Sequence, residues 1–211
     1  MSDADGTANG GKRPAITCYS DNEGGFMEWS QKIRGRLLDP MLSVMAGLGL
    51  RGNHVTFLSM VAGLAFCPLF LWVSKPLAFA MLLLHVLLDG LDGPLARYRG
   101  QATSRGSFTD TMADQLVVTA SALTMMQAGY AGAWAGGLYL FFYAVVVAFA
   151  FVRNALNVPY SWLFRPRFLV FIWFVVEVYL WPGSIDIVLW AASGLLALKC
   201  FTGFIKIRRR M

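Results

Sequence analysis

Charged residues are scarce in this chain. Lys, Arg, Asp and Glu make up 14% of its 211 residues, whereas a soluble domain usually carries about a quarter. Hydrophobic residues make up 57% of the chain, and the mean hydropathy is +0.56. This composition argues against a soluble globular domain and predicts an integral membrane protein.

Cysteine is also rare. Cys18, Cys67 and Cys200 lie far apart with no CxxC spacing, which excludes a disulfide framework and a Cys-based zinc site. Residues 1–26 are polar and rich in glycine, so we expect a disordered tail and no cleavable signal peptide.

Long apolar segments fill the rest of the sequence. A membrane helix needs about 20 mostly apolar residues. Residues 27–50 mix apolar and basic side chains, which is typical of an amphipathic helix lying in the membrane interface. The fold class we predict is an all-α membrane protein, with this interfacial helix followed by a six-helix transmembrane domain over residues 51–211. The six predicted spans are Val55–Val73, Leu77–Ala96, Phe108–Ala128, Trp134–Val152, Phe168–Trp181 and Ile185–Ile205.

Basic residues predict the topology. If both termini are cytoplasmic, the short outer loops hold only Lys75, and the other basic residues that flank the spans fall inside. This asymmetry satisfies the positive-inside rule and fits an even number of spans. The formal net charge of +6 therefore indicates contact with anionic lipid headgroups and no role in binding nucleic acid.

Four aspartates gather where the second and third predicted spans meet. Asp89 and Asp92 are three residues apart, and Asp110 and Asp114 are four apart, so each pair shares one helix face. The loop between these spans is short, and we therefore expect the spans to be antiparallel neighbours whose acidic faces converge. Clustered carboxylates repel one another, and divalent cations such as magnesium, manganese or calcium relieve that repulsion.

Small and basic residues accompany the aspartates. Gly93 and Ala96 allow a ligand to approach the second span closely, and Gly106 does the same at the third. Arg97 can hold a diphosphate beside the carboxylates. A lone DxxD is usually a solvated face, but four aspartates on two adjoining spans with these neighbours favour a functional site.

The segment from Asp89 to Asp114 resembles the CDP-alcohol phosphatidyltransferase family. It matches DxxDGxxAR, eight residues, then GxxxDxxxD at every fixed position, and Pro94 falls on a free position. The resemblance implies transfer of a phosphatidyl group from a CDP-lipid such as CDP-diacylglycerol to a small alcohol, with release of CMP. It also implies two Mg²⁺ (or Mn²⁺) ions, a homodimer, and residues 51–211 as the catalytic domain.

The same resemblance implies roles for single residues. Asp89, Asp92 and Asp110 would be metal ligands, and Asp114 would be both a ligand and the general base. The CDP-lipid would contact Gly93, Ala96, Arg97 and Gly106, together with Asn53 and Thr56 ahead of the first span. Asn53 as a helix cap is the alternative interpretation. We expect His54 at the interface and His85 in a structural role.

The acceptor is less well defined by the sequence. Arg153, Arg165, Arg167 and Lys199 are candidates to bind a phosphate on the acceptor, although the arginines also serve topology. Glycerol 3-phosphate is our first expectation and an inositol phosphate the second. Residues 108–115 resemble the glycerol-phosphate branch, but Gln115 replaces its usual lysine. Free serine, inositol or ethanolamine stays open.

Two other classes of protein keep carboxylates in membrane helices. A prenyltransferase is typically larger and has no reason for the GxxxDxxxD spacing. A transporter more often places such residues at the midplane of internal repeats, and this sequence has no repeat.

Our expectation is a multi-pass protein of a bacterial inner membrane whose site faces the cytoplasm.

Overall fold

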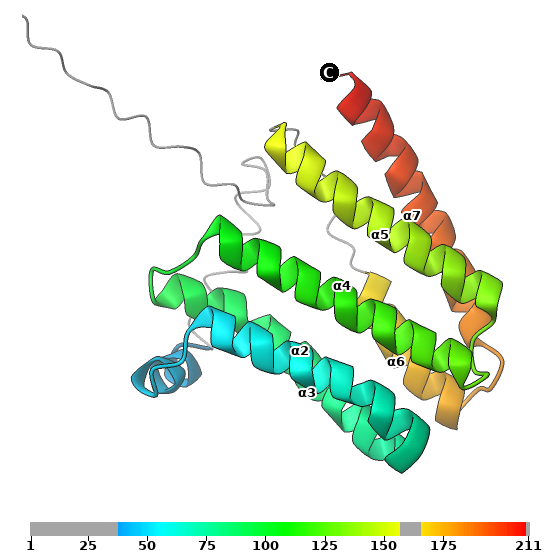
Figure 1. Cartoon of the computed structure of the whole chain (residues 1–211), viewed down its shortest axis with the longest axis horizontal. Helices are drawn as coiled ribbons and strands as arrows, with labels where there is room; N and C mark the ends of the chain where they lie inside the picture. The colour runs from blue at the N-terminus through cyan, green and yellow to red at the C-terminus, as the bar shows by residue number, and fades with distance from the viewer. Residues whose placement is uncertain (1–37, 157–165, 210–211) are drawn as a thin grey trace, which may run out of the picture.

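The computed structural model describes residues 38–156 and 166–209, and within these ranges every regular element is a helix. A helical segment over residues 38–47 comes first. The remaining elements, drawn in Figure 1, confirm the predicted all-α class. They are α2 (Gly52–Pro68), its π-helical continuation η2 (Leu69–Val73), α3 (Lys75–Tyr98), α4 (Ser104–Gln127), α5 (Ala133–Ala155), α6 (Pro166–Tyr179) and α7 (Ile185–Arg208).

Local signals set the helix ends at the site. The α3 helix ends before Gly100, whose φ of 64° suits glycine. The α4 helix begins after Thr103, whose side-chain oxygen accepts a hydrogen bond from the Gly106 N–H at 3.1 Å. The turn between these helices is therefore short, and it reverses the chain next to the aspartates.

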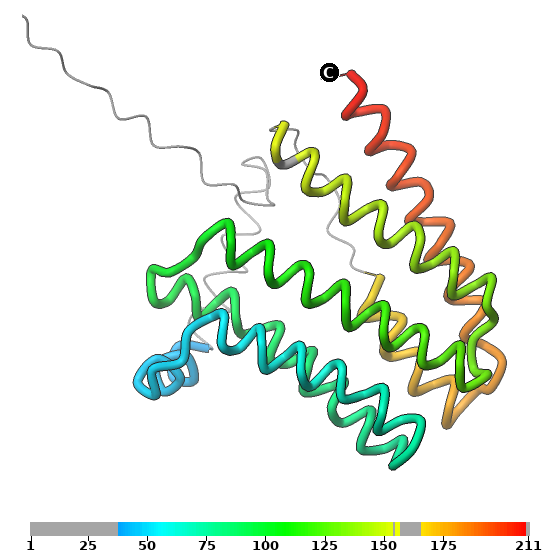
Figure 2. Tube along the Cα trace, viewed as in Figure 1, coloured from blue at the N-terminus to red at the C-terminus, as the bar shows by residue number. Residues whose placement is uncertain are grey.

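Successive helices run in opposite directions, as the tube in Figure 2 shows. The aspartate-bearing C-terminal half of α3 and N-terminal half of α4 consequently lie towards the same end of the bundle. The last turn of α5 and the first turn of α6 lie towards that end too. Ion pairs of Arg167 bring the first turn of α6 to Asp89 and Asp114, whereas Lys75 is at the opposite end of α3 from the aspartates.

Helix packing differs from our expectation in one respect. The α2 helix packs extensively against α3 and also against α4, whereas the α3 and α4 backbones make little direct contact. Spans two and three are antiparallel and their acidic faces converge, as predicted, but their backbones are not closely packed. The first span lies against both, and the aspartate side chains reach across between α3 and α4.

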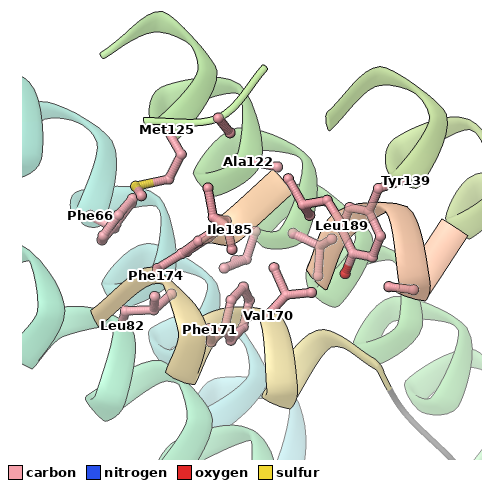
Figure 3. Close-up of a cluster of buried hydrophobic side chains, with 14 of the residues drawn as sticks. Phe66, Leu82, Ala122, Met125, Tyr139, Val170, Phe171, Phe174, Ile185 and Leu189 are labelled. Carbon is pink, nitrogen blue, oxygen red and sulfur yellow. The ribbon is translucent and has the colours of Figure 1, made fainter. Parts of the chain in front are cut away.

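Aromatic and aliphatic side chains form the main core. Figure 3 shows side chains of all the helices from α2 to α7 meeting in this cluster. Phe66 of α2 stacks on Phe70 with ring centroids 5.1 Å apart and lies 6.5 Å from Phe174 of α6. The core holds the helices together away from the polar end. The labelled members are Phe66, Leu82, Ala122, Met125, Tyr139, Val170, Phe171, Phe174, Ile185 and Leu189.

Two acidic groups organise the end opposite the aspartates. Glu177, near the end of α6, is 2% exposed and accepts backbone N–H bonds from Gly183 at 2.6 Å and Ile185 at 2.8 Å. Those N–H groups lie at the start of α7, where a negative charge is stabilising. Asp186 likewise accepts from the Gly132 N–H at 2.8 Å, just before α5. Glu177 and Asp186 therefore serve structure.

Four helices are long and apolar enough to cross a membrane: Gly52–Val73, Lys75–Tyr98, Ala133–Arg153 and Ile185–Arg208. These correspond to predicted spans one, two, four and six. The α4 helix has 24 residues but carries Asp110 and Asp114 among many polar side chains. The α6 helix has 14 residues, which extend over only about 21 Å at roughly 1.5 Å per residue. The structure thus supports four of the six predicted spans.

Tryptophans mark the end of the bundle opposite the aspartates. Trp72 lies in the last part of η2, Trp134 is the second residue of α5 and Trp181 follows α6, and their exposed fractions are 78%, 80% and 60%. Tryptophan concentrates at membrane–water interfaces. Exposed apolar side chains also line the candidate spans, among them Phe141, Leu198 and Phe201. The chain is an integral membrane protein.

Part of the predicted interfacial helix, residues 38–50, lies within the described ranges, and residues 27–37 lie outside them. Leu42 of the segment 38–47 is 2% exposed and packs with Val55 of α2 and Leu95 of α3. The Arg99 guanidinium donates to the Leu50 carbonyl at 2.6 Å. The segment is therefore docked on the aspartate end of the bundle.

The alternating directions predict opposite accessibility for two exposed loops. In a variant without Cys18, Cys67 and Cys200, Gln101→Cys and Pro182→Cys should react with a membrane-impermeant maleimide from opposite sides of the membrane. The basic residues predict that position 101 reacts only after permeabilisation. Labelling of both positions from the same side would contradict this topology.

Candidate active site and metal centre

Three of the four aspartates meet at one point. Asp89 and Asp92 of α3 and Asp110 of α4 each offer a carboxylate oxygen, and these atoms lie within 4.8 Å of one another. Asp92 is buried, and the other two are half-buried. The i, i+3 spacing on α3 aims two carboxylates in the same direction, and the short turn to α4 brings in the third.

A matching stripe of small residues on α2 faces the aspartate helix. A methyl group added at Gly52 would lie 2.9 Å from the Ala96 Cβ, so the two backbones nearly touch there. One turn on, the Thr56 hydroxyl donates to Asp92 Oδ2 at 2.6 Å. The other Asp92 oxygen, Oδ1, accepts the Gly93 N–H at 2.5 Å. The Asp92 carboxylate is consequently held in one orientation.

Arg167 supplies the positive charge at the aspartates. Its Nη2 lies 2.6 Å from Asp89 Oδ2, and its Nη1 pairs with Asp114 Oδ2. Arg167 is 2% exposed, and its Nε has no hydrogen-bond partner among the described residues. We predicted this arginine as an acceptor ligand or a topology signal. In the structure it bridges two aspartates from the first turn of α6, and its role as an acceptor ligand stays a prediction.

Asp114 occupies a different position from the other aspartates. It is 8% exposed and lies outside the group of three oxygens. Besides Arg167, its neighbour is His85, whose Nε2 lies 4.0 Å from Asp114 Oδ1. Asp114 is therefore flanked by side chains of α3 and α6, and its role as a fourth metal ligand stays a prediction.

The predicted nucleotide residues lie on two sides of the cluster. Arg97 is exposed, and a side chain at Gly93 would contact its guanidinium at 3.5 Å. Across the site, a methyl group at Gly106 would lie 3.4 Å from the exposed Asn53 Oδ1. Arg51 occupies the N-cap position of α2, so Asn53 as a cap is wrong. Asn53 and Arg97 are exposed polar groups beside the aspartates.

The remaining acceptor candidates lie on other helices. Arg153 is in the last turn of α5 and is 7% exposed, and Lys199 is half-buried in α7. Contacts between α5 and α7 place Cys200 beside Phe142, with Cys200 Sγ 3.7 Å from the Phe142 carbonyl. Lys199 therefore lies deeper along the bundle than Arg153. Arg165 lies outside the described residues.

The donor set fits a hard divalent cation. Ionised, the four aspartates carry four negative charges and Arg167 offsets one of them, so three remain to be balanced. Carboxylate oxygens are the ligands that magnesium, manganese and calcium prefer. Asp89, Asp92 and Asp110 could therefore hold such an ion.

A family model describes most of this chain. Residues 51–204 match the model for CDP-alcohol phosphatidyltransferase. The chain belongs to this family. The family is a class of enzymes that transfer phosphatidyl groups and release CMP. The match covers α2 to α6 and most of α7, and so includes the whole aspartate site.

Two curated proteins that are similar to this chain come from archaea. The chain is 31% identical over 81 residues to the archaetidylinositol phosphate synthase of Aeropyrum pernix, covering 38% of this chain and 42% of the relative. It is 32% identical over 88 residues to that of Pyrococcus horikoshii, covering 40% and 47%. The chain thus spans less than half the length of these relatives. Both relatives are archaeal, so neither supports the expected bacterial inner membrane.

Solved structures share the fold. Phosphatidylinositol phosphate synthase of Mycobacterium tuberculosis with CDP-DAG bound superposes with a TM-score of 0.66 at 19% identity, over 82% of this chain and 94% of that one. The same synthase in complex with manganese and citrate gives a TM-score of 0.65 at 18% identity, over 80% and 87%. At this identity the likeness establishes the helical fold alone.

The hydrogen bonds that α2 side chains make to the site were not predicted from the sequence. Thr56 stays a predicted contact of the nucleotide, and the structure adds that its hydroxyl binds Asp92. Ser59 was not singled out, yet it holds His85. A signal for both is present in the sequence, because Gly52, Thr56, Ser59 and Gly63 recur at helical spacing in an apolar helix. Such a small-residue stripe indicates the face against which a functional helix packs.

Metal binding can be tested apart from turnover. Asp92→Asn and Asp110→Asn should each weaken Mn²⁺ binding by at least about tenfold, because each removes a charged ligand. Titration of purified protein followed by electron paramagnetic resonance measures this. Asp186→Asn is the matched control, since that carboxylate caps Gly132 at the other end. Unchanged Mn²⁺ affinity in both cluster variants would exclude this metal centre.

Arg167 should stabilise the protein more when no metal is bound than when the site holds a metal ion. Arg167→Met leaves Asp89 and Asp114 without their ion pairs, and breaking a buried pair costs about 3–5 kcal/mol. Thermal unfolding in EDTA should show a large fall in Tm, and added Mn²⁺ should recover part of it. Arg167→Lys should be less affected. An Arg167→Met variant as stable as the wild type in EDTA would contradict this role.

Proposed function

We propose that this enzyme transfers the phosphatidyl-type group of a CDP-linked lipid to an inositol phosphate and releases CMP. The observation that carries the proposal is the convergence of Asp89, Asp92 and Asp110 with a buried arginine, at the motif of a phosphatidyltransferase family. The inositol-phosphate acceptor is supported by the names of the two archaeal relatives. The CDP-lipid donor is supported by the CDP-DAG bound to the mycobacterial synthase.

Asp89, Asp92 and Asp110 would hold the metal in this reaction. A divalent ion bound there, magnesium or manganese, neutralises the donor diphosphate and stabilises the charge that develops during transfer. Two ions are proposed, with Asp114 as an additional ligand. Thr56 keeps Asp92 oriented towards its partners on α3 and α4, so the ligand geometry is set before substrate binds.

The CDP end of the donor would lie between Arg97 and Asn53. Arg97 is exposed on the aspartate-bearing half of α3, so its guanidinium is free to bind a phosphate oxygen. Gly93, Ala96 and Gly106 are small, so the ligand could approach the backbones of α3 and α4 closely at this position. Asn53 offers an amide towards the nucleotide, whereas Thr56 acts through Asp92.

Asp114 would act as the general base. The acceptor hydroxyl gives its proton to an Asp114 oxygen, and its oxygen forms a bond to the phosphorus that bears the lipid. The bond from that phosphorus to the bridging oxygen of the diphosphate breaks, and CMP leaves with the electron pair. Asp114 suits this part because it is buried next to the three proposed ligands but lies outside their group.

The acceptor phosphate would bind the basic residues of α5 to α7. Arg167 is already at the aspartates, and its unpartnered Nε is a donor for a phosphate oxygen. Arg153, in the last turn of α5, would extend this positive region, with Arg165 and Lys199 as further candidates. Holding the phosphate there would aim a neighbouring hydroxyl at the donor, which is catalysis by positioning. The site would face the cytoplasm, and a homodimer is the proposed assembly.

A panel of acceptors tests the proposal directly. Purified enzyme with CDP-diacylglycerol or CDP-archaeol should release CMP with an inositol phosphate, more slowly with glycerol 3-phosphate, and hardly with free inositol or serine. Omission of the acceptor controls for hydrolysis. Efficient turnover with a free alcohol and none with either phosphate ester would contradict the acceptor assignment.

Asp114→Asn should lower kcat by about 10²- to 10⁴-fold, the usual contribution of base catalysis. The variant should still bind CDP-lipid, because Arg97 and the three remaining aspartates are intact. Gln115→Glu changes the next residue and serves as a control for local disturbance. Near-normal CMP release by Asp114→Asn would remove this residue from the role of base.

A further inference from the structure

Arg167 belongs to two parts of the proposed site at once. Its Nη2 lies 2.6 Å from Oδ2 of Asp89, which is one of the three proposed metal ligands. Its Nε has no hydrogen-bond partner among the described residues and is the proposed donor for the acceptor phosphate. One side chain therefore contacts a metal ligand and offers a donor to the second substrate.

The guanidinium of Arg167 is enclosed by the protein. The residue is 2% exposed, and its Cζ lies 4.7 Å from the centroid of the Phe168 ring. Charges in such surroundings interact more strongly than in water and are screened less by salt. A buried donor without a partner is also costly. The state of Arg167 therefore depends strongly on the charges that are placed next to it.

Two carboxylates hold this arginine when no metal ion is bound. Asp89 and Asp114 both pair with it, so two negative charges compensate one guanidinium. A phosphate that approaches Arg167 has to compete with these carboxylates for N–H groups, and it is repelled by their charges. We therefore expect a low affinity for phosphate as long as both carboxylates keep their full charge.

A divalent ion held by Asp89, Asp92 and Asp110 would change this balance. Asp89 would then serve two cations, and the ion and the guanidinium repel each other. The hold of Asp89 on Arg167 becomes weaker, and part of the negative charge that opposes a phosphate is neutralised. A phosphate on Arg167 in turn offsets the repulsion between the two cations. The metal ion and the phosphate therefore favour the binding of each other.

We propose that Arg167 couples the metal site to the acceptor site, so that the acceptor phosphate binds tightly only when Asp89 holds a metal ion. The coupling rests on the proposed function, because it takes Asp89 as a metal ligand and Arg167 as a phosphate ligand. It links α3 to α6 through one ion pair. An enzyme without its metal would consequently not retain the acceptor.

The wild-type enzyme provides the first test, with inorganic phosphate as the probe. Isothermal titration calorimetry measures the affinity for phosphate in EDTA and in saturating Mg²⁺. Coupling between two sites usually changes an affinity by about 5- to 150-fold, and we expect Mg²⁺ to raise the phosphate affinity within this range. The same affinity in EDTA and in Mg²⁺ would overturn the coupling.

Two variants separate the coupling from direct attraction between phosphate and the metal ion. In EDTA, Asp89→Asn removes a charge that holds Arg167, so it should bind phosphate at least about fivefold more tightly than the wild type. Asp92→Asn is the matched control, because Asp92 carries the same charge on the same helix but binds Thr56 and the Gly93 N–H. It should raise the phosphate affinity much less. Thermal unfolding in EDTA verifies that both variants are folded.

A phosphate affinity in EDTA that rises equally in Asp89→Asn and Asp92→Asn would overturn the coupling, since both variants would then act only through the net charge. An unchanged affinity in Asp89→Asn would overturn it as well. If Asp89→Asn does not fold, the wild-type comparison still decides. These outcomes leave the proposed function intact, whereas failure of the wild-type enzyme to release CMP with any acceptor would contradict the proposed function itself.

Discussion

Mutual repulsion among four carboxylates is the constraint on which this structure depends. They lie at one end of an otherwise apolar helix bundle, where ionised groups are costly without partners. Side chains of the neighbouring helices offset part of that free-energy cost. Thr56 binds Asp92, and Arg167 pairs with Asp89 and Asp114. The charge that these contacts leave unbalanced is what makes the site suited to a divalent cation and a diphosphate.

The contact between α2 and α3 places the side chains that bind the buried polar groups of α3. Gly52 lies on Ala96, Thr56 reaches Asp92, and Ser59 reaches His85, so successive turns of two antiparallel helices are paired. Small residues on α2 allow the close approach, and polar ones among them bind the functional side chains. Because α4 also packs on α2, the same helix helps to fix where Asp110 and Asp114 stand.

The sequence was sufficient for the helical class, the family and the convergence of the aspartates, because these follow from hydropathy and from i, i+3 and i, i+4 spacing. It could not give the packing order, since a short turn makes α3 and α4 consecutive without making them closely packed. Arg167 was ambiguous for a similar reason. A basic residue at a helix start satisfies the positive-inside rule as well as an ion pair, and only the fold shows that it meets Asp89. The sequence also predicted six spans, whereas the structure supports four, because α4 is only weakly apolar and α6 is short.

The central claim is that the α3 and α4 aspartates form a metal-dependent site completed by Arg167. Anomalous diffraction from crystals grown with Mn²⁺ tests it most directly, because the signal locates the ion among named side chains. The account predicts a peak within coordination distance of Asp89, Asp92 and Asp110, with the Arg167 guanidinium still within the site. A fully loaded crystal with no peak at these carboxylates, or with the ion bound elsewhere in the bundle, would contradict it.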